Sequence, residues 1–167
     1  TARVSGYVYW DKNQNQQRDK GEEGIKGVLV SNQVQVVQTD KNGRYTIGIE
    51  EGNVLFVTKP AGYNLRLSSK NLPQFFYVYS LEGFPDLKYE GVPPSGDLPE
   101  EINFPLYKNV AEDSFSVIVF SDPQPRNQQE IDYIRDDVVS EILGTSSSFV
   151  IVLGDIMYND LSLNEPY

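Results

Sequence analysis

Phe115-Ser-Val-Ile-Val-Phe-Ser-Asp122 and Phe149-Val-Ile-Val-Leu-Gly-Asp155 are the two stretches that decide the fold of the second half of this sequence. Each is a short run rich in β-branched and aromatic residues that ends in an aspartate. Runs of this kind are typical of strands that are buried on both faces of a parallel sheet. Ligands of open α/β sheets bind beyond the carboxyl ends of the strands, so Asp122 and Asp155 are predicted to lie at the edge of a site.

A helix is predicted between these two strands. Gly144 is suited to end it, and apolar residues recur at helical spacing before that glycine, at Ile131, Ile134, Val138 and Ile142, with Val139 and Leu143 extending the same stripe. A strand, a helix and a second strand form a βαβ unit, which makes a right-handed crossover between parallel strands. Because two strands and one helix cannot enclose a core, we expect the unit to begin a larger domain.

The first 108 residues follow a different pattern, in which short strands alternate with turns such as Asp40-Lys-Asn-Gly43. This pattern predicts a small all-β sandwich over residues 1–108, a linker at 109–114 and the α/β segment over 115–167. Residues 82–101 are expected to form an irregular loop. The predicted strands are Val4–Trp10, Gly27–Ser31, Val34–Thr39, Arg44–Ile49, Val54–Thr58, Phe75–Tyr79 and Asn103–Tyr107.

The chain is acidic and contains neither cysteine nor histidine. Its formal net charge is −10, and from Phe115 onward two basic residues stand against nine acidic ones. Such a charge argues against nucleic acid and anionic membranes as partners. Without cysteine or histidine the chain offers no thiolate or imidazole ligand, and no apolar stretch reaches the ~18 residues of a membrane span.

Asp122 and Asp155 are the first candidate metal ligands. Hard divalent cations prefer carboxylate oxygens, and a shared carboxylate can bridge two ions in a hydrolytic site. Gly154 allows a close approach of the backbone to an ion or a phosphate. The alternative interpretation is that both aspartates only cap the turn or helix that follows each strand.

The pattern Asp122-Pro-Gln124, then a helix, then Gly154-Asp155-Ile-Met-Tyr-Asn159-Asp160 resembles the start of a calcineurin-like metallophosphoesterase. The resemblance implies an α/β/β/α sandwich with two divalent ions (Mn, Fe or Zn). Asp122 and Gln124 would contact the first ion, Asp155 would bridge both, and Asn159 or Asp160 would lie in a supporting loop. Gln124 stands where the family usually has histidine, which leaves the metal preference open, although some bacterial branches use Asp-Pro-Gln.

The later histidine and asparagine motifs of that family have no counterpart in this sequence. We therefore expect an N-terminal fragment that has no certain catalytic residue and is inactive by itself. The intact protein would hydrolyse a small phosphate ester. Its substrate could be a phosphomonoester, a phosphodiester, a nucleotide or a phospholipid head group, and its partner would be the remainder of its own catalytic domain.

A second candidate site lies near the start of the chain. Oxygen-bearing side chains occupy loop positions 1, 3, 5, 7, 9 and 12, which is the ligand rhythm of a calcium loop, although Gln16 replaces the usual glycine at position 6. The alternative is a polar loop with local Asx turns. The six candidate ligands are Asp11, Asn13, Asn15, Gln17, Asp19 and Glu22.

This loop, together with Gly24-Ile-Lys-Gly27 and Thr39-Asp40-x-x-Gly43-x-Tyr45, resembles prealbumin-like or immunoglobulin-like β-sandwich modules. Among these are carboxypeptidase-regulatory-like domains and the calcium-binding repeats of bacterial surface adhesins. Two functions follow. The first is the N-terminal part of a bacterial phosphoesterase, and the alternative is a non-enzymatic, calcium-stabilised surface or adhesion module. Either function is expected in the periplasm or at the cell surface, with the cytoplasm as the other option. A flavodoxin-like domain is a third interpretation of the βαβ unit, but the phosphate loop it requires is absent.

Overall fold

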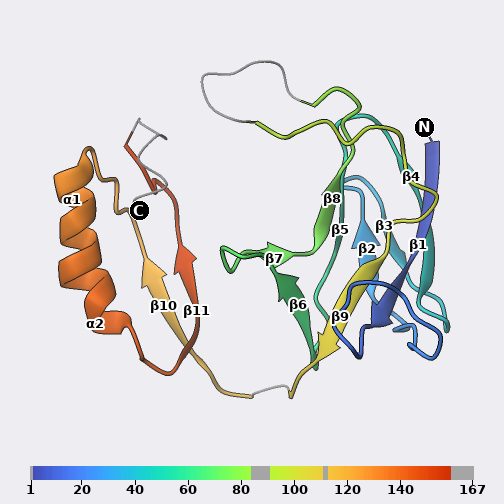
Figure 1. Ribbon diagram of the computed structural model, residues 1–167, viewed down its shortest axis with the longest axis horizontal. Helices are drawn as coiled ribbons and strands as arrows, with labels where there is room; N and C mark the ends of the chain where they lie inside the picture. Colours follow the sequence, from blue (N-terminus) through green and yellow to red (C-terminus); the bar gives the residue numbers. More distant parts are fainter. Residues whose placement is uncertain (1, 84–90, 111–112, 159–167) are drawn as a thin grey trace. The chain divides into compact units, whose positions relative to one another are not determined.

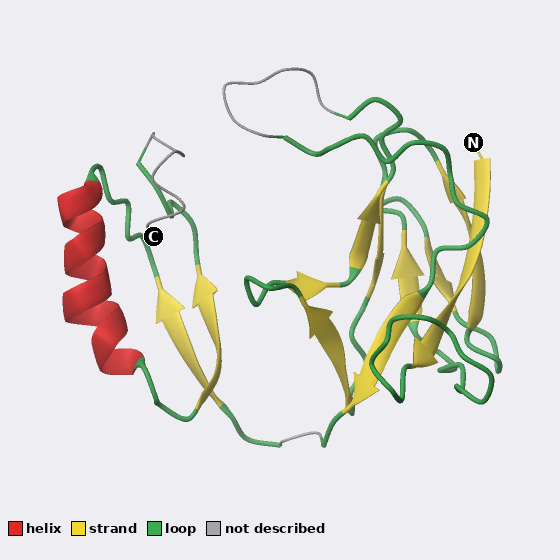
Figure 2. Ribbon diagram, viewed as in Figure 1, coloured by secondary structure: helices red, strands yellow, loops and turns green. Residues whose placement is uncertain are grey.

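The computed structural model describes residues 2–83, 91–110 and 113–158 of the chain. The chain divides into two compact units, with the boundary between residues 111 and 112. The chain is rich in β-structure and contains little helix, as Figures 1 and 2 show. The coarse prediction of a β-rich first half is therefore confirmed.

The first unit contains a five-stranded sheet in the order β4-β1-β9-β6-β7. β1 and β9 are parallel, with Val8 opposite Phe104, and the other pairs in this sheet are antiparallel. Its strands are β1 (Ala2–Trp10), β4 (Arg44–Ile49), β6 (Tyr63–Leu67), β7 (Pro73–Gln74) and β9 (Phe104–Lys108).

A four-stranded antiparallel sheet completes the first unit, in the order β3-β2-β5-β8. β3 is shorter than predicted because the side chain of Asn32 accepts hydrogen bonds from the backbone of Val34 and Gln35 and so holds those residues in a turn. The four strands are β2 (Leu29–Ser31), β3 (Val36–Gln38), β5 (Val54–Val57) and β8 (Phe76–Val78).

One hydrophobic core joins the two sheets of the first unit. The longer strands contribute alternate residues to it, as β4 does with Tyr45, Ile47 and Ile49, which is expected where one face of a sheet is buried. β6 and β7 were not predicted, because Tyr63-Asn-Leu-Arg-Leu67 follows a turn and has only a weak alternation. The buried core residues are Val4, Val8, Val28, Val30, Tyr45, Ile47, Ile49, Leu55, Val57, Ile102, Phe104 and Leu106.

Three backbone hydrogen bonds attach the loop after β1 and the turn before β4 to β1 itself. Trp10 N–H donates to Glu23 O and Ile25 N–H to Val8 O, both at 2.8 Å, while Val8 N–H donates to Gly43 O at 2.9 Å. The backbones pass so closely that a Cβ atom on Gly24 would overlap the carbonyl group of Asn42. Glycine is therefore required at this crossing.

Substituting Gly24→Ala should lower the free energy of unfolding by about 3 kcal/mol, because the added methyl group meets backbone that cannot move aside. Gly21→Ala is the matched control. Gly21 has a positive φ of 97° but open space around it, so this change should cost only about 1 kcal/mol. Urea unfolding of the full chain measures both losses, and equal losses would contradict the close approach.

Asp40 organises the turn between β3 and β4. Its Oδ1 accepts hydrogen bonds from the backbone N–H groups of Arg44 and Asn42, each at 2.8 Å. These bonds, the one from Arg44 first, lower the pKa of the Asp40 carboxyl. The carboxylate thus stabilises the turn in its charged form. The turn connects strands of two different sheets, so the predicted hairpin at Asp40-Lys-Asn-Gly43 is wrong.

Asp40→Asn should destabilise the chain at neutral pH, and the difference from wild type should shrink in acid. A lowered pKa in the folded state adds stability above the unfolded value of 3.8, and this stability is lost as the pH falls through the folded pKa. Urea unfolding at several pH values from 7 to about 3 tests this. A gap that stays constant with pH would show that the charge has no role.

The second unit contains two parallel strands, β10 (Ser116–Phe120) and β11 (Ser147–Val152), with a helix between them. Figure 2 shows the helix beside the strand pair. The helix begins as α1 (Gln128–Tyr133), continues as the π-helical segment η1 (Ile134–Val139) and ends as α2 (Ser140–Ile142). The predicted strand–helix–strand order is confirmed.

The π-helical segment changes which residues face the sheet. Ile131, Ile134 and Val139 line a small hollow against Phe120, Val150 and Val152. The step from Ile134 to Val139 is five residues, as the wider π-helical turn requires. Of the predicted stripe, Val139 therefore faces the strands as expected, whereas Val138 and Leu143 are 42% and 73% exposed.

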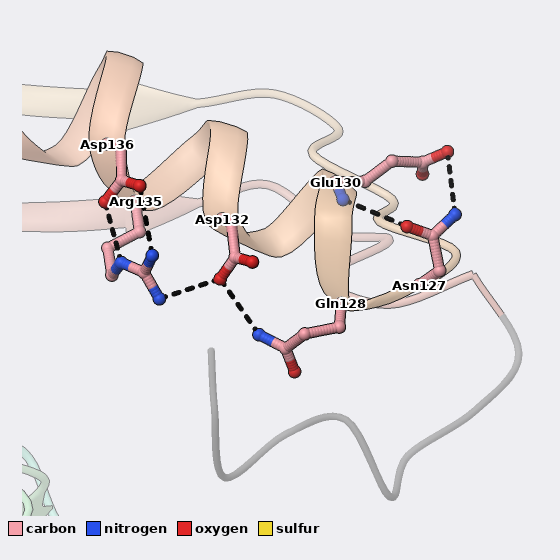
Figure 3. A network of polar contacts seen from close by, with 6 residues as sticks. All are labelled: Asn127, Gln128, Glu130, Asp132, Arg135 and Asp136. Atoms are coloured by element: carbon pink, nitrogen blue, oxygen red, sulfur yellow. Dashed lines mark hydrogen bonds and ion pairs between the residues drawn. The ribbon is translucent and has the colours of Figure 1, made fainter.

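The start of the helix is capped by side chains, as Figure 3 shows. Asn127 Oδ1 accepts the backbone N–H of Glu130 at 3.0 Å, which satisfies one of the free donors of the first turn. Further along, Arg135 Nη1 lies 2.8 Å from Asp132 Oδ1 and its Nε donates to Asp136 Oδ1 at 2.8 Å. This network lies on the solvent side of the helix, so it adds little stability.

Candidate functional site

Asp122, Gln124 and Asp155 meet where β10 and β11 end. Phe120 pairs with Val152, and Leu153 N–H donates to Phe120 O at 2.9 Å, so the two chains leave the sheet side by side. Gln124 N–H then donates to Asp155 O at 2.9 Å, and Gln124 Nε2 donates to Asp155 Oδ2 at 2.5 Å. A shallow pocket at this edge is lined by Ser121, Asp122, Leu153, Gly154 and Asp155.

The backbone at this edge adopts conformations that are rare for residues with side chains. Gln124 has a φ of 36° and Asp155 a φ of 45°, both in the left-handed region. Such residues cost about 1–3 kcal/mol each, and they are often found at functional sites. The turn therefore holds its polar side chains in place at a cost in stability.

The donor atoms at this edge suit a hard divalent cation in kind but are too few to enclose one. Two exposed carboxylates and one amide oxygen are available. Within the described residues, no three His, Cys, Asp or Glu side chains are gathered closely enough to hold a metal ion. Asn159 and Asp160, the predicted supporting loop, lie outside the described residues.

The predicted calcium loop lies directly after β1. Asp11 is 1% exposed and Glu22 is 8% exposed, which is unusual for carboxylates. Glu22 accepts the backbone N–H of Lys12 at 2.8 Å and that of Asp19 at 3.0 Å. Asp11 Oδ2 accepts the N–H of Gln16 at 2.8 Å. The two buried carboxylates thus close the loop from within.

The polar side chains of this loop also bind one another. Asp19 Oδ2 accepts the side-chain amides of Asn13 and Asn15, each at 2.8 Å. The side-chain oxygens of Asn13 and Asn15 accept the backbone N–H groups of Asn15 and Gln17 at 3.1 and 2.8 Å. These are Asx turns, which are also the features of the alternative interpretation, a polar loop without calcium.

Gln16 occupies the loop position where calcium loops usually have glycine. Its φ is 68°, in the left-handed region, and Gln14 has a φ of 60°. The sharp turn that glycine normally provides is therefore made here with a strained glutamine.

One atom of Asp11 is left without a partner. Its Oδ1 is buried and accepts no hydrogen bond from any described residue. An unsatisfied buried carboxylate oxygen costs about 1–3 kcal/mol or more, because it has lost water and gained nothing in return. Such an atom marks a place where a cation or a water molecule belongs.

Cation–π contacts hold the loop and its surroundings against the sheet. The Arg18 guanidinium lies 3.8 Å from the Tyr7 ring centroid. The Trp10 ring has Lys108 Nζ at 3.5 Å and Lys12 Nζ at 4.6 Å. The contacts of Lys12 and Arg18 thus join the loop to β1, and that of Lys108 joins β9 to β1.

Tyr9 is a member of the loop site that sequence reasoning missed. It is completely buried, and its hydroxyl has no hydrogen-bond partner among the described residues. Burial first, and then the charges of Asp11 and Glu22, raise the pKa of the Tyr9 hydroxyl above its usual value. Strand alternation puts Tyr9 opposite the core-facing Val8. A strand pattern alone does not reveal its burial, nor the β-bridge that Tyr9 forms with Gly24 at the end of the loop.

Comparison with known proteins bears on the first unit. A family model described as the N-terminal part of calcineurin-like phosphoesterase matches residues 12–86. This match supports the prediction of a calcineurin-like phosphoesterase fragment. It falls on the β-rich unit and leaves the unit with Asp122 and Asp155 outside.

A curated relative aligns with more than half of the chain. Colossin-B from Dictyostelium discoideum is 31% identical over 108 residues, which is 64% of this chain. The chain spans only 3% of the length of that relative.

No helix among the described residues is long and apolar enough to cross a membrane.

Proposed function

We propose that this chain is the N-terminal part of a metal-dependent phosphoesterase from a bacterium, in which a prealbumin-like β-sandwich precedes the catalytic domain. The observation that carries the proposal is the family match at residues 12–86. The second unit supports it independently, because Asp122 and Asp155 follow adjacent parallel strands, where ligands of α/β sheets bind.

In the intact protein, Asp122 and Gln124 would hold one divalent ion and Asp155 would bridge two. The ions, when bound, would supply activated water and polarise the phosphate ester. The hydrogen bond from Gln124 Nε2 to Asp155 Oδ2 orients both side chains, and the side-chain oxygen of Gln124 would then serve as its metal ligand. The remaining ligands would come from the rest of the catalytic domain.

The apolar face of the strand pair that lies opposite the helix supports that partner. Parallel sheets are normally buried on both faces. Here Val119, Phe149 and Leu153 are 54%, 47% and 67% exposed among the described residues. Further sheet from the same catalytic domain would cover them.

Asp155→Asn in the full-length protein should lower phosphoesterase activity by about 100-fold or more, because a bridging carboxylate is replaced by a neutral amide. Asparagine tolerates the left-handed backbone of this position, so the fold should persist. Asp137→Asn, which changes an exposed acid on the helix, is the matched control and should retain full activity.

The assay uses Mn²⁺ with p-nitrophenyl phosphate and bis-p-nitrophenyl phosphate, which separates phosphomonoester from phosphodiester hydrolysis. Once the preferred ester class is known, nucleotides and phospholipid head groups of that class are tested as natural substrates. Wild-type activity that is unchanged in the Asp155→Asn protein would overturn the proposed metal centre.

The loop after β1 supports a second proposed function, a structural calcium site in a surface module. The observation that favours it is the buried, unpartnered Asp11 Oδ1. Calcium binding would require Asn13 and Asn15 to turn their amide oxygens toward the ion. The ion would then replace the two amide N–H groups that now donate to Asp19 Oδ2. The strained Gln16 and the small number of carboxylates lower the calcium affinity of the loop. Such an affinity suits the millimolar calcium found outside the cytoplasm.

Calcium at about ten times its Kd should stabilise the full chain by about 1.4 kcal/mol and raise its Tm by about 5 °C. Magnesium should have a smaller effect, because it demands near-octahedral geometry and gives up water reluctantly. Asp19→Asn should reduce the shift caused by calcium. Differential scanning calorimetry measures all three results, and a Tm that ignores millimolar calcium would contradict the site.

A further inference from the structure

Two buried polar atoms without partners lie close together at the end of β1. They are the hydroxyl of Tyr9 and Oδ1 of Asp11, and their residues are 0% and 1% exposed. Native proteins satisfy nearly all such atoms, so two neighbouring exceptions call for one explanation.

The two side chains lie on the same side of the strand. Asp11 follows β1, and its N–H donates to Leu106 O at 3.0 Å, so it continues the pairing of β1 with β9. Positions two apart in such an extended segment share a face, so Tyr9 and Asp11 lie on the face away from the core residue Val8. The backbone of Gly24 forms a β-bridge with Tyr9, so the returning end of the loop runs beside the tyrosine. The carboxylates that act on the Tyr9 hydroxyl are those of Asp11, Glu22 and Asp19, all from the loop.

The chemistry of the two atoms is complementary to a hydrated cation. A carboxylate oxygen only accepts, whereas a tyrosine hydroxyl donates one hydrogen bond and also accepts. A cation takes the negative oxygen as a ligand, and a water molecule on that cation can accept from or donate to the hydroxyl. A metal ligand is usually held by a further group of this kind, which fixes its orientation.

Building on the proposed calcium loop, we propose that Tyr9 is a positioning residue of that site, whose buried hydroxyl becomes satisfied, together with Asp11 Oδ1, when the ion and its water enter. Tyr9 lies outside the ligand rhythm of the loop, which begins at Asp11. The site would thus extend from the loop into the sheet, and calcium binding would tie the loop to β1.

Tyr9→Phe removes only the hydroxyl and tests this directly in the full chain. Without calcium the variant should be as stable as wild type or more stable, since the lost group had no partner. Its affinity for Ca²⁺, measured by isothermal titration calorimetry, should fall about tenfold. The rise in Tm that calcium causes should shrink accordingly.

Tyr45→Phe is the matched control, because the buried Tyr45 hydroxyl donates to Ile102 O at 2.6 Å. This variant should lose stability equally with and without calcium and keep the wild-type affinity. If wild type binds no Ca²⁺, the calcium loop itself fails. If wild type binds and Tyr9→Phe binds equally well, or loses the same stability in both conditions, a structural water explains the hydroxyl and the role of Tyr9 is overturned.

Discussion

The attachment of two chain segments to β1 is the constraint on which the first unit depends. Backbone hydrogen bonds fix the loop ending at Gly24 and the turn ending at Gly43 to the same strand. Because these bonds join backbone atoms across many residues of sequence, they set the position of the loop, the register of β4 and the entry into β2 together. A side chain on Gly24 would therefore disturb the core and the loop at once.

β1 also connects the core with the candidate calcium site. One face of the strand carries Val4 and Val8 into the core, and the other carries the buried Tyr9, which forms a β-bridge with Gly24 at the end of the loop. Asp11 follows at the end of the strand, so the position of its carboxylate is set by a well-packed element. A site on a rigid strand keeps its geometry better than a site on a free loop, which explains how strained residues such as Gln16 are tolerated there.

The second unit has a different balance of forces. Its strands bury little surface among the described residues, and its strand-end turn contains two residues in the left-handed region. The backbone strain that holds Asp122, Gln124 and Asp155 in place lowers the stability of this unit. Two nearby carboxylates in an acidic segment repel each other, and bound cations would relieve that repulsion. The family match at residues 12–86 lies in the first unit and does not extend to these residues.

Local pattern and chemistry were enough to predict most strands, the helix between β10 and β11, and the meeting of Asp122 with Asp155, because parallel strands present their carboxyl ends at one edge. Non-local packing decided the rest. β6 forms because its neighbour β9 supplies hydrogen bonds that its own pattern does not announce. The π-helical segment changes which residues face the sheet, and Tyr9 and Asp11 are both buried where the end of the loop pairs with β1. The sequence by itself determined which residues could build a strand or offer an oxygen ligand. Only the tertiary structure decided which of these residues are shielded from water, since burial depends on segments that are distant along the chain.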